Sequence, residues 1–183
     1  MSVFAFAGAR RTGSLNRKLL GIAVELLRGH GVEVELGELR DFDMPLYDGD
    51  LEASGALPAG ALALAAKITA ARGLVIASPE YNYSMPGVLK NAIDWLSRLK
   101  PMPLRDKRAL LLSASPSLVG GNRGLWSLRV PLEGLGVHVF PEMYSLASAH
   151  QNLAGDGIAD PLLAKMLEGT MKRFAAELVR RPG

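Results

Sequence analysis

The stretch from Ser78 to Arg98 constrains the fold of this chain more than any other. It follows the apolar run Gly73–Ala77, which predicts a strand buried on both faces. Beyond it, apolar residues recur at helical spacing from Val88 to Leu96. Pro86 suits the first turn of that helix, because an N–H at this position would have no helical partner. The sequence therefore predicts a strand, a polar loop and a helix in immediate succession.

The loop Pro79–Ser84 joins this strand to this helix. It contains a glutamate, two tyrosines, an asparagine and a serine, which is more ring surface and hydrogen-bonding capacity than a connector needs. In an open parallel sheet, ligands bind at the carboxyl ends of the strands. From the loop alone, an ordinary turn with two surface tyrosines is an equally good interpretation, so other loops must decide.

A second polar loop follows the first strand. Val3–Ala7 is continuously apolar and predicts another buried strand, and Gly8–Asn16 then leads into a helix that extends to about Arg28. The free N–H groups and the dipole at a helix N-terminus favour an anion. Arg11 can add charge-assisted hydrogen bonds, while the side chains of Ser14 and Asn16 are neutral donors.

The spacing of the glycines in this loop indicates which kind of phosphate ligand it could bind. Gly8 and Gly13 match the glycine spacing of a Walker loop, but Ser14 stands where the lysine of that motif belongs. A dinucleotide-binding G-x-G-x-x-G is absent. The remaining interpretation is a cradle for the phosphate of a mononucleotide, which is compatible with Ser14 also acting as the N-cap of the helix.

A third glycine-bearing loop, Ser113–Gly124, follows the predicted strand Ala109–Leu112. Seen alone, it is as well explained as a flexible connector. The other expected elements are an edge strand with alternating polarity at Val32–Leu36, a long crossing loop at Arg40–Ala59, a helix at Ala61–Ala71, a short last strand at Val137–Phe140 and a final helix that Asp160 and Pro161 begin.

Five strands thus alternate with five helices, and we expect one α/β domain over residues 1–183. Right-handed crossovers give a doubly wound sheet between two helical layers. The half-exposed second strand favours a five-stranded parallel sheet in the flavodoxin-like order 2-1-3-4-5. In that order the loops after strands one, three and four converge, and these are the three loops described above.

Composition excludes several classes of function. There is no cysteine, so thiol chemistry and iron–sulfur ligation are absent, and redox work would need a bound cofactor. The three histidines are scattered without metal-ligand spacing, and the net charge of +3 is spread too thinly to indicate nucleic acid. No apolar run reaches the roughly 20 residues of a membrane span. We expect a soluble, cytoplasmic protein.

These motifs together resemble a known family. The stretch from Ser78 to Arg98 resembles the signature of NADPH-dependent FMN reductases, a group that includes chromate- and quinone-reducing flavoproteins. The resemblance lies in Pro79–Asn82, Pro86-Gly87 and Leu89–Trp95. The first loop fits that family's pattern at Gly8, Arg11, Gly13, Ser14 and Asn16, and departs at Ala9 and Arg10, which replace a serine and a leucine. Ser115-Pro116 and Gly120-Gly121 resemble its third loop, and the resemblance extends from about Val3 to Pro141.

The resemblance implies FMN as cofactor and NADPH or NADH as cosubstrate. It implies that Arg11, Ser14, the Leu15 backbone and Asn16 hold the FMN phosphate, that Pro79, Glu80, Tyr81 and Asn82 border the isoalloxazine largely through backbone groups, and that Ser115, Gly120 and Gly121 close its other side. Because family members are commonly dimers or tetramers, it also implies that Tyr83, Met85 and Trp95 belong to a subunit contact rather than to the core.

The expected activity is hydride transfer from the nicotinamide to bound flavin, and onward to a small-molecule acceptor such as a quinone, a metal oxyanion, an azo compound or another flavin. The flavin carries this chemistry, so no catalytic side chain is assigned. The main alternative is a flavodoxin-type electron carrier without substrate turnover. Carriers of that kind are usually acidic and lack the loop at Pro79–Ser84.

Overall fold

The fold is built on a parallel sheet. The computed structural model of the protein describes residues 2–179. Neighbouring strands in the main sheet follow the order β2-β1-β3-β4-β5, and all of these pairs are parallel, so the predicted flavodoxin-like order is confirmed. The strands are β1 (Ser2–Ala7), β2 (Glu33–Glu38), β3 (Gly73–Ala77), β4 (Arg108–Ala114) and β5 (His138–Val139).

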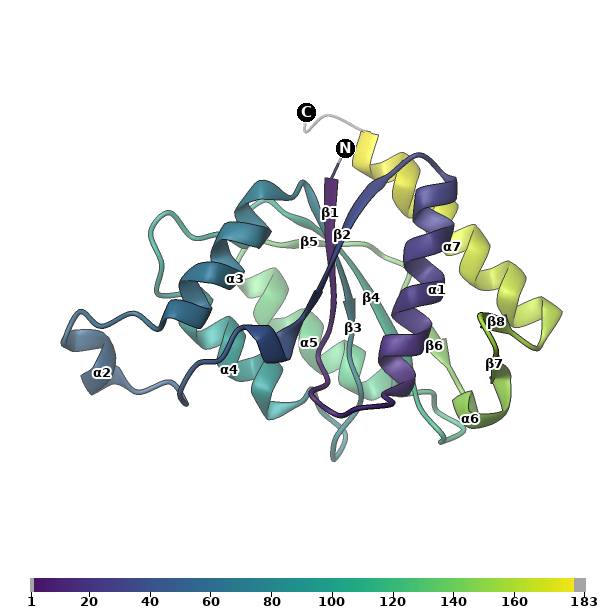
Figure 1. The fold of residues 1–183 in the computed structure, drawn as a ribbon, viewed down its shortest axis with the longest axis horizontal. Coiled ribbons are helices and arrows are strands. Elements are labelled where there is room, and N and C mark those ends of the chain that lie inside the picture. The colour runs from purple at the N-terminus through teal and green to yellow at the C-terminus, as the bar shows by residue number, and fades with distance from the viewer. Residues whose placement is uncertain (1, 180–183) are drawn as a thin grey trace.

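Helices cover both faces of this sheet, which explains why its central strands are apolar throughout. Val3 and Ala5 of β1 pack against one helical layer, and Phe4 and Phe6 pack against the other. Figure 1 shows the resulting three layers. One layer contains α1 (Leu15–Gly29) and α7 (Pro161–Val179), and the opposite layer contains α3 (Ala59–Ala70), α4 (Gly87–Leu96) and α5 (Asn122–Gly134).

The final helix begins as the sequence predicts. The Asp160 carboxylate accepts hydrogen bonds from the N–H groups of Leu162 and Leu163 at 2.8 and 3.1 Å, and Pro161 is the first helical residue. In the described part of the chain, no helix combines the length and the apolar character needed to cross a membrane.

The last strand of the sheet differs from its prediction at Val137–Phe140. Only His138 and Val139 form β5, and a further strand, β6 (Tyr144–Leu146), pairs with the second half of β4. Pro141 lies between the two segments and has no N–H to donate, which favours a break in the ladder. The chain then forms α6 (Ala149–Asn152) and a small hairpin of β7 (Leu153–Ala154) and β8 (Gly157–Ile158).

The crossing segment also differs from its prediction as a loop at Arg40–Ala59. It contains a short 3₁₀ helix, η1 (Leu39–Asp41), and α2 (Gly49–Ala53), whose N-cap Asp48 accepts from the Asp50 N–H at 2.8 Å. Figure 1 shows α2 standing out from the body of the molecule. Because α2 buries none of its residues, it leaves no hydrophobic periodicity in the sequence.

The assignment of Trp95 to a subunit contact is wrong. Its side chain is fully buried within the chain, and its indole N–H donates to the Pro45 carbonyl at 2.9 Å. Tyr47 packs edge-on against the indole, and Asn91 bonds to Pro45 and Tyr47 as well. The crossing segment therefore covers the side of α4 that would otherwise be open.

Tyr83 and Met85, the other two residues assigned to the subunit contact, differ in their exposure to solvent. Tyr83 is largely exposed, at 70% of its surface, whereas Met85 is half-buried and packs against the core. Val88, which the helical periodicity places in the apolar stripe, is also exposed.

We predict that Trp95→Ala lowers the free energy of unfolding by about 3–5 kcal/mol, because it leaves a cavity and removes one of the two hydrogen bonds that the Pro45 carbonyl accepts. Urea unfolding of the purified protein measures this loss. The matched control is Trp126→Ala, because Trp126 is 57% exposed on α5 and its loss should cost within about 0.5 kcal/mol. Equal losses in the two variants would contradict the core position of Trp95.

Candidate functional site at the carboxyl edge of the sheet

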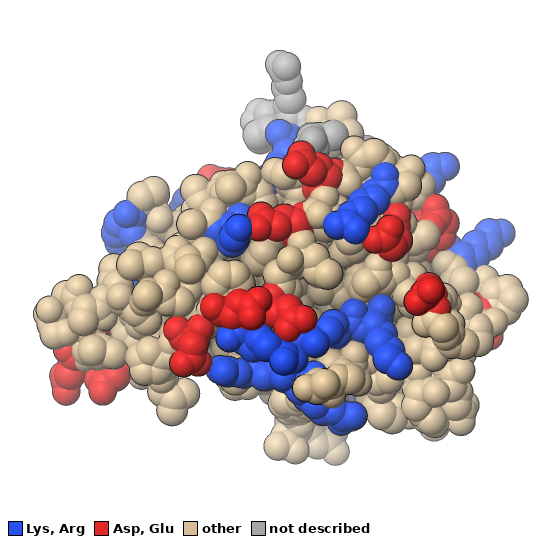
Figure 2. Space-filling view, in the orientation of Figure 1, with Lys and Arg blue, Asp and Glu red and all other residues tan. Residues whose placement is uncertain are grey.

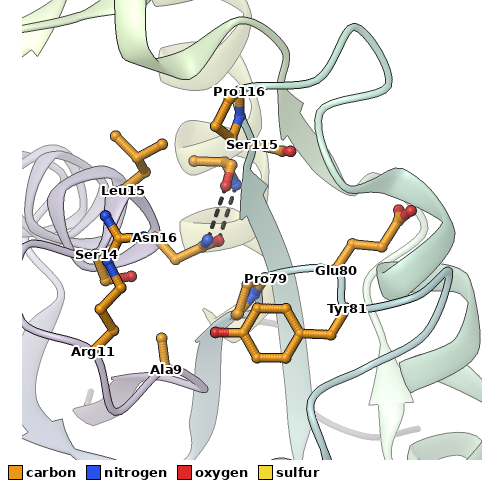
Figure 3. A pocket seen from close by; sticks show the side chains of 11 residues that line it. Ala9, Arg11, Ser14, Leu15, Asn16, Pro79, Glu80, Tyr81, Ser115 and Pro116 are labelled. Carbon is orange, nitrogen blue, oxygen red and sulfur yellow. Dashed lines mark hydrogen bonds between the residues drawn. The ribbon is translucent and has the colours of Figure 1, made fainter.

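The loops after β1, β3 and β4 meet at the carboxyl edge of the sheet. They leave the sheet side by side, since the Gly8 N–H donates to the Ala77 carbonyl at 2.9 Å and the Ser78 N–H donates to the Leu112 carbonyl at 2.8 Å. Between them lies a cleft of about 170 Å³. Figure 3 shows the side chains that line it: Ala9, Arg11, Ser14, Leu15, Asn16, Pro79, Glu80, Tyr81, Ala114, Ser115 and Pro116.

The first loop brings to this cleft polar groups that have no partner in the described part of the chain. Ser14 is the N-cap of α1, yet its hydroxyl makes no capping hydrogen bond although only 7% of the residue is exposed. The N–H groups of Leu15 and Asn16 precede the first helical hydrogen bonds and have no carbonyl inside the helix to bond. Arg11 lies beside them and forms no ion pair with any residue among 2–179. This arrangement suits an anion.

The side chain of Asn16 bonds to the protein itself, unlike those of Ser14 and Arg11. Its amide nitrogen donates to the Ala114 carbonyl and its amide oxygen accepts from the Ala114 N–H, both at 2.9 Å. The two dashed lines in Figure 3 mark this pair. Only 3% of Asn16 is exposed, so the pair is shielded from water. Asn16 thus joins the first loop to the end of β4, and this role has no signal in the sequence.

The second loop contains a tight turn. Tyr81 and Ser84 exchange backbone hydrogen bonds at 2.9 and 3.0 Å. Asn82 and Tyr83, between them, both have positive φ, at 49° and 67°. This left-handed pair is the geometry of a type I′ turn, which a tyrosine rarely adopts. Figure 3 shows the ring of Tyr81 pointing toward the cleft, whereas Asn82 does not line it.

The side chain of Glu80 points away from the cleft (Figure 3). Its carboxylate accepts hydrogen bonds from the Gly124 N–H at 3.1 Å and from Arg123 Nε at 2.9 Å, at the start of α5. Glu80 therefore presents its backbone to the cleft, in keeping with the predicted backbone contacts of this loop.

The third loop supplies Ser115 and, unpredicted, its neighbours Ala114 and Pro116. Gly120 and Gly121, which the sequence singled out, do not line the cleft. Both have positive φ, at 67° and 87°. A Cβ at Gly121 would also lie 2.1 Å from the hydroxyl of Ser113, so only glycine fits there. These glycines let the loop turn back against β4, and a contact with ligand stays a prediction.

Arg10 faces the other side of the first loop. It pairs with Asp43 at 3.1 Å, and it lines a separate apolar depression together with Phe42 and Val88. Figure 2 shows Lys and Arg side chains gathered where α1 begins, with a row of acidic side chains beside them. Arg17 in this region pairs with Glu38, so acidic neighbours already compensate part of the positive charge.

Comparison with known proteins agrees with this geometry. The family model for NADPH-dependent FMN reductases matches residues 1–151. The quinone reductase of Escherichia coli K12 is 36% identical over 180 residues, which cover 97% of this chain and 92% of that protein. The chain belongs to the NADPH-dependent FMN reductase family. The resemblance seen in the sequence is confirmed.

Further relatives of this FMN reductase family agree. An NAD(P)H-dependent FMN reductase of Pseudomonas aeruginosa is 40% identical over 152 residues, covering 83% of this chain and 80% of that one. The solved structure of the flavoenzyme NAD(P)H:(acceptor) oxidoreductase FerB from Paracoccus denitrificans superposes with a TM-score of 0.82 at 30% identity, covering 97% and 96% of the two chains. The chain is thus an oxidoreductase of this family, and none of these relatives supports the electron-carrier alternative.

We predict that Asn16→Ala lowers the free energy of unfolding by about 1–3 kcal/mol, because the buried N–H and carbonyl of Ala114 would both lose their partner. Chemical unfolding of the flavin-free protein measures this loss. Asn122→Ala is the matched control, since Asn122 is only partly buried at the start of α5 and makes no side-chain hydrogen bond within the described residues. A loss no larger than that of the control would contradict the structural role of Asn16.

Proposed function

We propose that this reductase holds FMN in the cleft at the carboxyl edge of its sheet and passes hydride from NADPH or NADH through it to a quinone. One observation carries the proposal: the Ser14 hydroxyl and Arg11, neither of which has a side-chain partner within residues 2–179, lie beside the N-terminus of α1. A dianionic phosphate would satisfy all three. The quinone acceptor is supported by the names of relatives from Escherichia coli and rice.

The residues present fit FMN at both ends of the cleft. At the phosphate end, Arg11, the Ser14 hydroxyl and the backbone N–H groups of Leu15 and Asn16 would donate. At the ring end, the backbone of Pro79 and Glu80, the ring of Tyr81 and the side chain of Ser115 would form the border. Asn82, Gly120 and Gly121 remain proposed contacts that the cleft does not include.

FMN, when bound, supplies the hydride chemistry. The protein binds, orients and shields it. The phosphate contacts at α1 fix one end, and the loop at Pro79–Ser84 and the residues at Ser115-Pro116 bound the other. No side chain is assigned as a catalytic acid or base. The side of the cleft that stays open to solvent would then admit a nicotinamide first and a flat acceptor afterwards.

The proposed setting is a homodimer or homotetramer in the cytoplasm. The exposed ring of Tyr83 and the exposed Val88, which lines the separate apolar depression, are the surfaces that support a subunit contact. NADPH and NADH stay equal candidates, because Arg10, which could have favoured the extra phosphate, already pairs with Asp43 on the far side of its loop.

We predict that Arg11→Ala weakens FMN binding by about 1.5–3 kcal/mol, which is the usual contribution of a charged hydrogen bond. Riboflavin has the same ring but no phosphate, so its affinity should not change. Fluorescence titration of the flavin-free protein measures both constants. The matched control is Arg10→Ala, which removes the adjacent arginine on the opposite side of the loop. Unchanged FMN affinity in Arg11→Ala would remove Arg11 from the site.

The proposed reaction predicts a protein that is yellow as purified, or one that keeps the flavin absorbance after it is mixed with FMN and desalted. Under anaerobic conditions, NADPH or NADH should bleach the flavin absorbance, and a soluble benzoquinone should restore it. Rapid mixing in an absorbance spectrometer follows both steps. A protein that binds FMN but is not bleached by either nicotinamide would contradict reductase activity.

A further inference from the structure

Helix α5 contacts the loop at Pro79–Ser84 on the side that faces away from the cleft. The Glu80 side chain is only 9% exposed, and its carboxylate meets Arg123 through Nε at 2.9 Å and Nη2 at 2.7 Å. It also accepts from the Gly124 N–H at 3.1 Å. An arginine fork and a helix N-terminus thus share one carboxylate, which fixes the direction of the Glu80 backbone.

The same guanidinium also contacts the tip of the loop. Its Cζ lies 4.3 Å from the centre of the Tyr83 ring, in a cation–π contact. Tyr83 and Asn82 are the two residues of this turn with positive φ, a conformation that is unfavourable for a side chain such as that of tyrosine. Arg123 therefore bonds one side of the turn through Glu80 and covers the other side through Tyr83.

The first turns of α5 fit closely against this loop. A Cβ on Gly124 would lie 3.0 Å from Glu80 Cα and 3.2 Å from the Ser84 carbonyl oxygen, so the helix backbone is in near contact with the loop. The Ser127 hydroxyl accepts from the Met85 N–H at 2.8 Å. The loop is thus supported along its length, and Arg123 is the charged part of that support.

We propose that Arg123 is a positioning residue for the flavin ring. It does not line the cleft, but it holds Glu80 and Tyr83 on either side of Tyr81, whose ring points toward the cleft. Its effect reaches the ring end of the cleft and not the phosphate end, where Arg11 and Ser14 lie. This inference rests on the proposed FMN site.

A comparison of two flavins separates this role from the phosphate contacts. In Arg123→Ala, the affinities of the flavin-free protein for FMN and for riboflavin should fall by the same factor, about 2- to 30-fold, because both ligands carry the ring. In Arg11→Ala only FMN should lose affinity. Arg123→Lys should recover part of the loss, since a lysine keeps the charge near Glu80 but has neither the fork nor the flat face.

A matched control tests whether losing any stacked arginine has this effect. Arg98, which follows the end of α4, lies 5.5 Å from the centre of the Tyr47 ring and does not line the cleft. Arg98→Ala should leave both flavin affinities unchanged. Thermal unfolding of each flavin-free variant shows whether the fold is retained.

Unchanged riboflavin affinity in folded Arg123→Ala, or a loss confined to FMN, would overturn the inference. If Arg123→Ala does not fold, Glu80→Gln serves instead, since it keeps an acceptor for the Gly124 N–H but removes the charge that Arg123 meets. It should weaken both flavins alike, and unchanged riboflavin affinity would overturn the inference. A wild-type protein that binds neither flavin would overturn the proposed function, and the inference with it.

Discussion

The parallel pairing of β1, β3 and β4 is the constraint on which the rest of the structure depends. Parallel strands emerge at the same edge, so three loops far apart in the sequence must meet there. The buried amide pair between Asn16 and Ala114 then fixes the first loop against the third. Because a solvent-shielded pair of this kind is costly to leave unmade, the spacing between these two walls of the cleft is well defined.

Polar residues at this edge divide into two groups. The side chains of Asn16 and Glu80 form hydrogen bonds with other parts of the protein, and these bonds hold the loops in shape. Ser14 and Arg11 have no such partner within residues 2–179, and they are the residues that we propose for ligand binding. Both groups look alike in the sequence, since each consists of polar side chains in a loop beside a helix. The two groups can be told apart only from the hydrogen bonds that their side chains make in the structure.

Much of the fold could be predicted because its signals are local. Each central strand is an uninterrupted apolar run, and each loop of the site follows such a run directly. The burial of Trp95 could not be predicted, because its cover is the segment around Pro45, which has no regular pattern and reaches α4 across some fifty positions. Gly120 and Gly121 indicated a special turn correctly, but glycine reveals a backbone shape and not the direction in which the loop faces.

The partner of Asn16 is a main chain and not a side chain. Every amino acid except proline offers the same N–H and carbonyl, so position 114 could change its side chain while the two loops stay joined. That position also forms part of the wall of the cleft. A change of side chain there would therefore alter the shape of this wall while the two groups that join the walls stay in place.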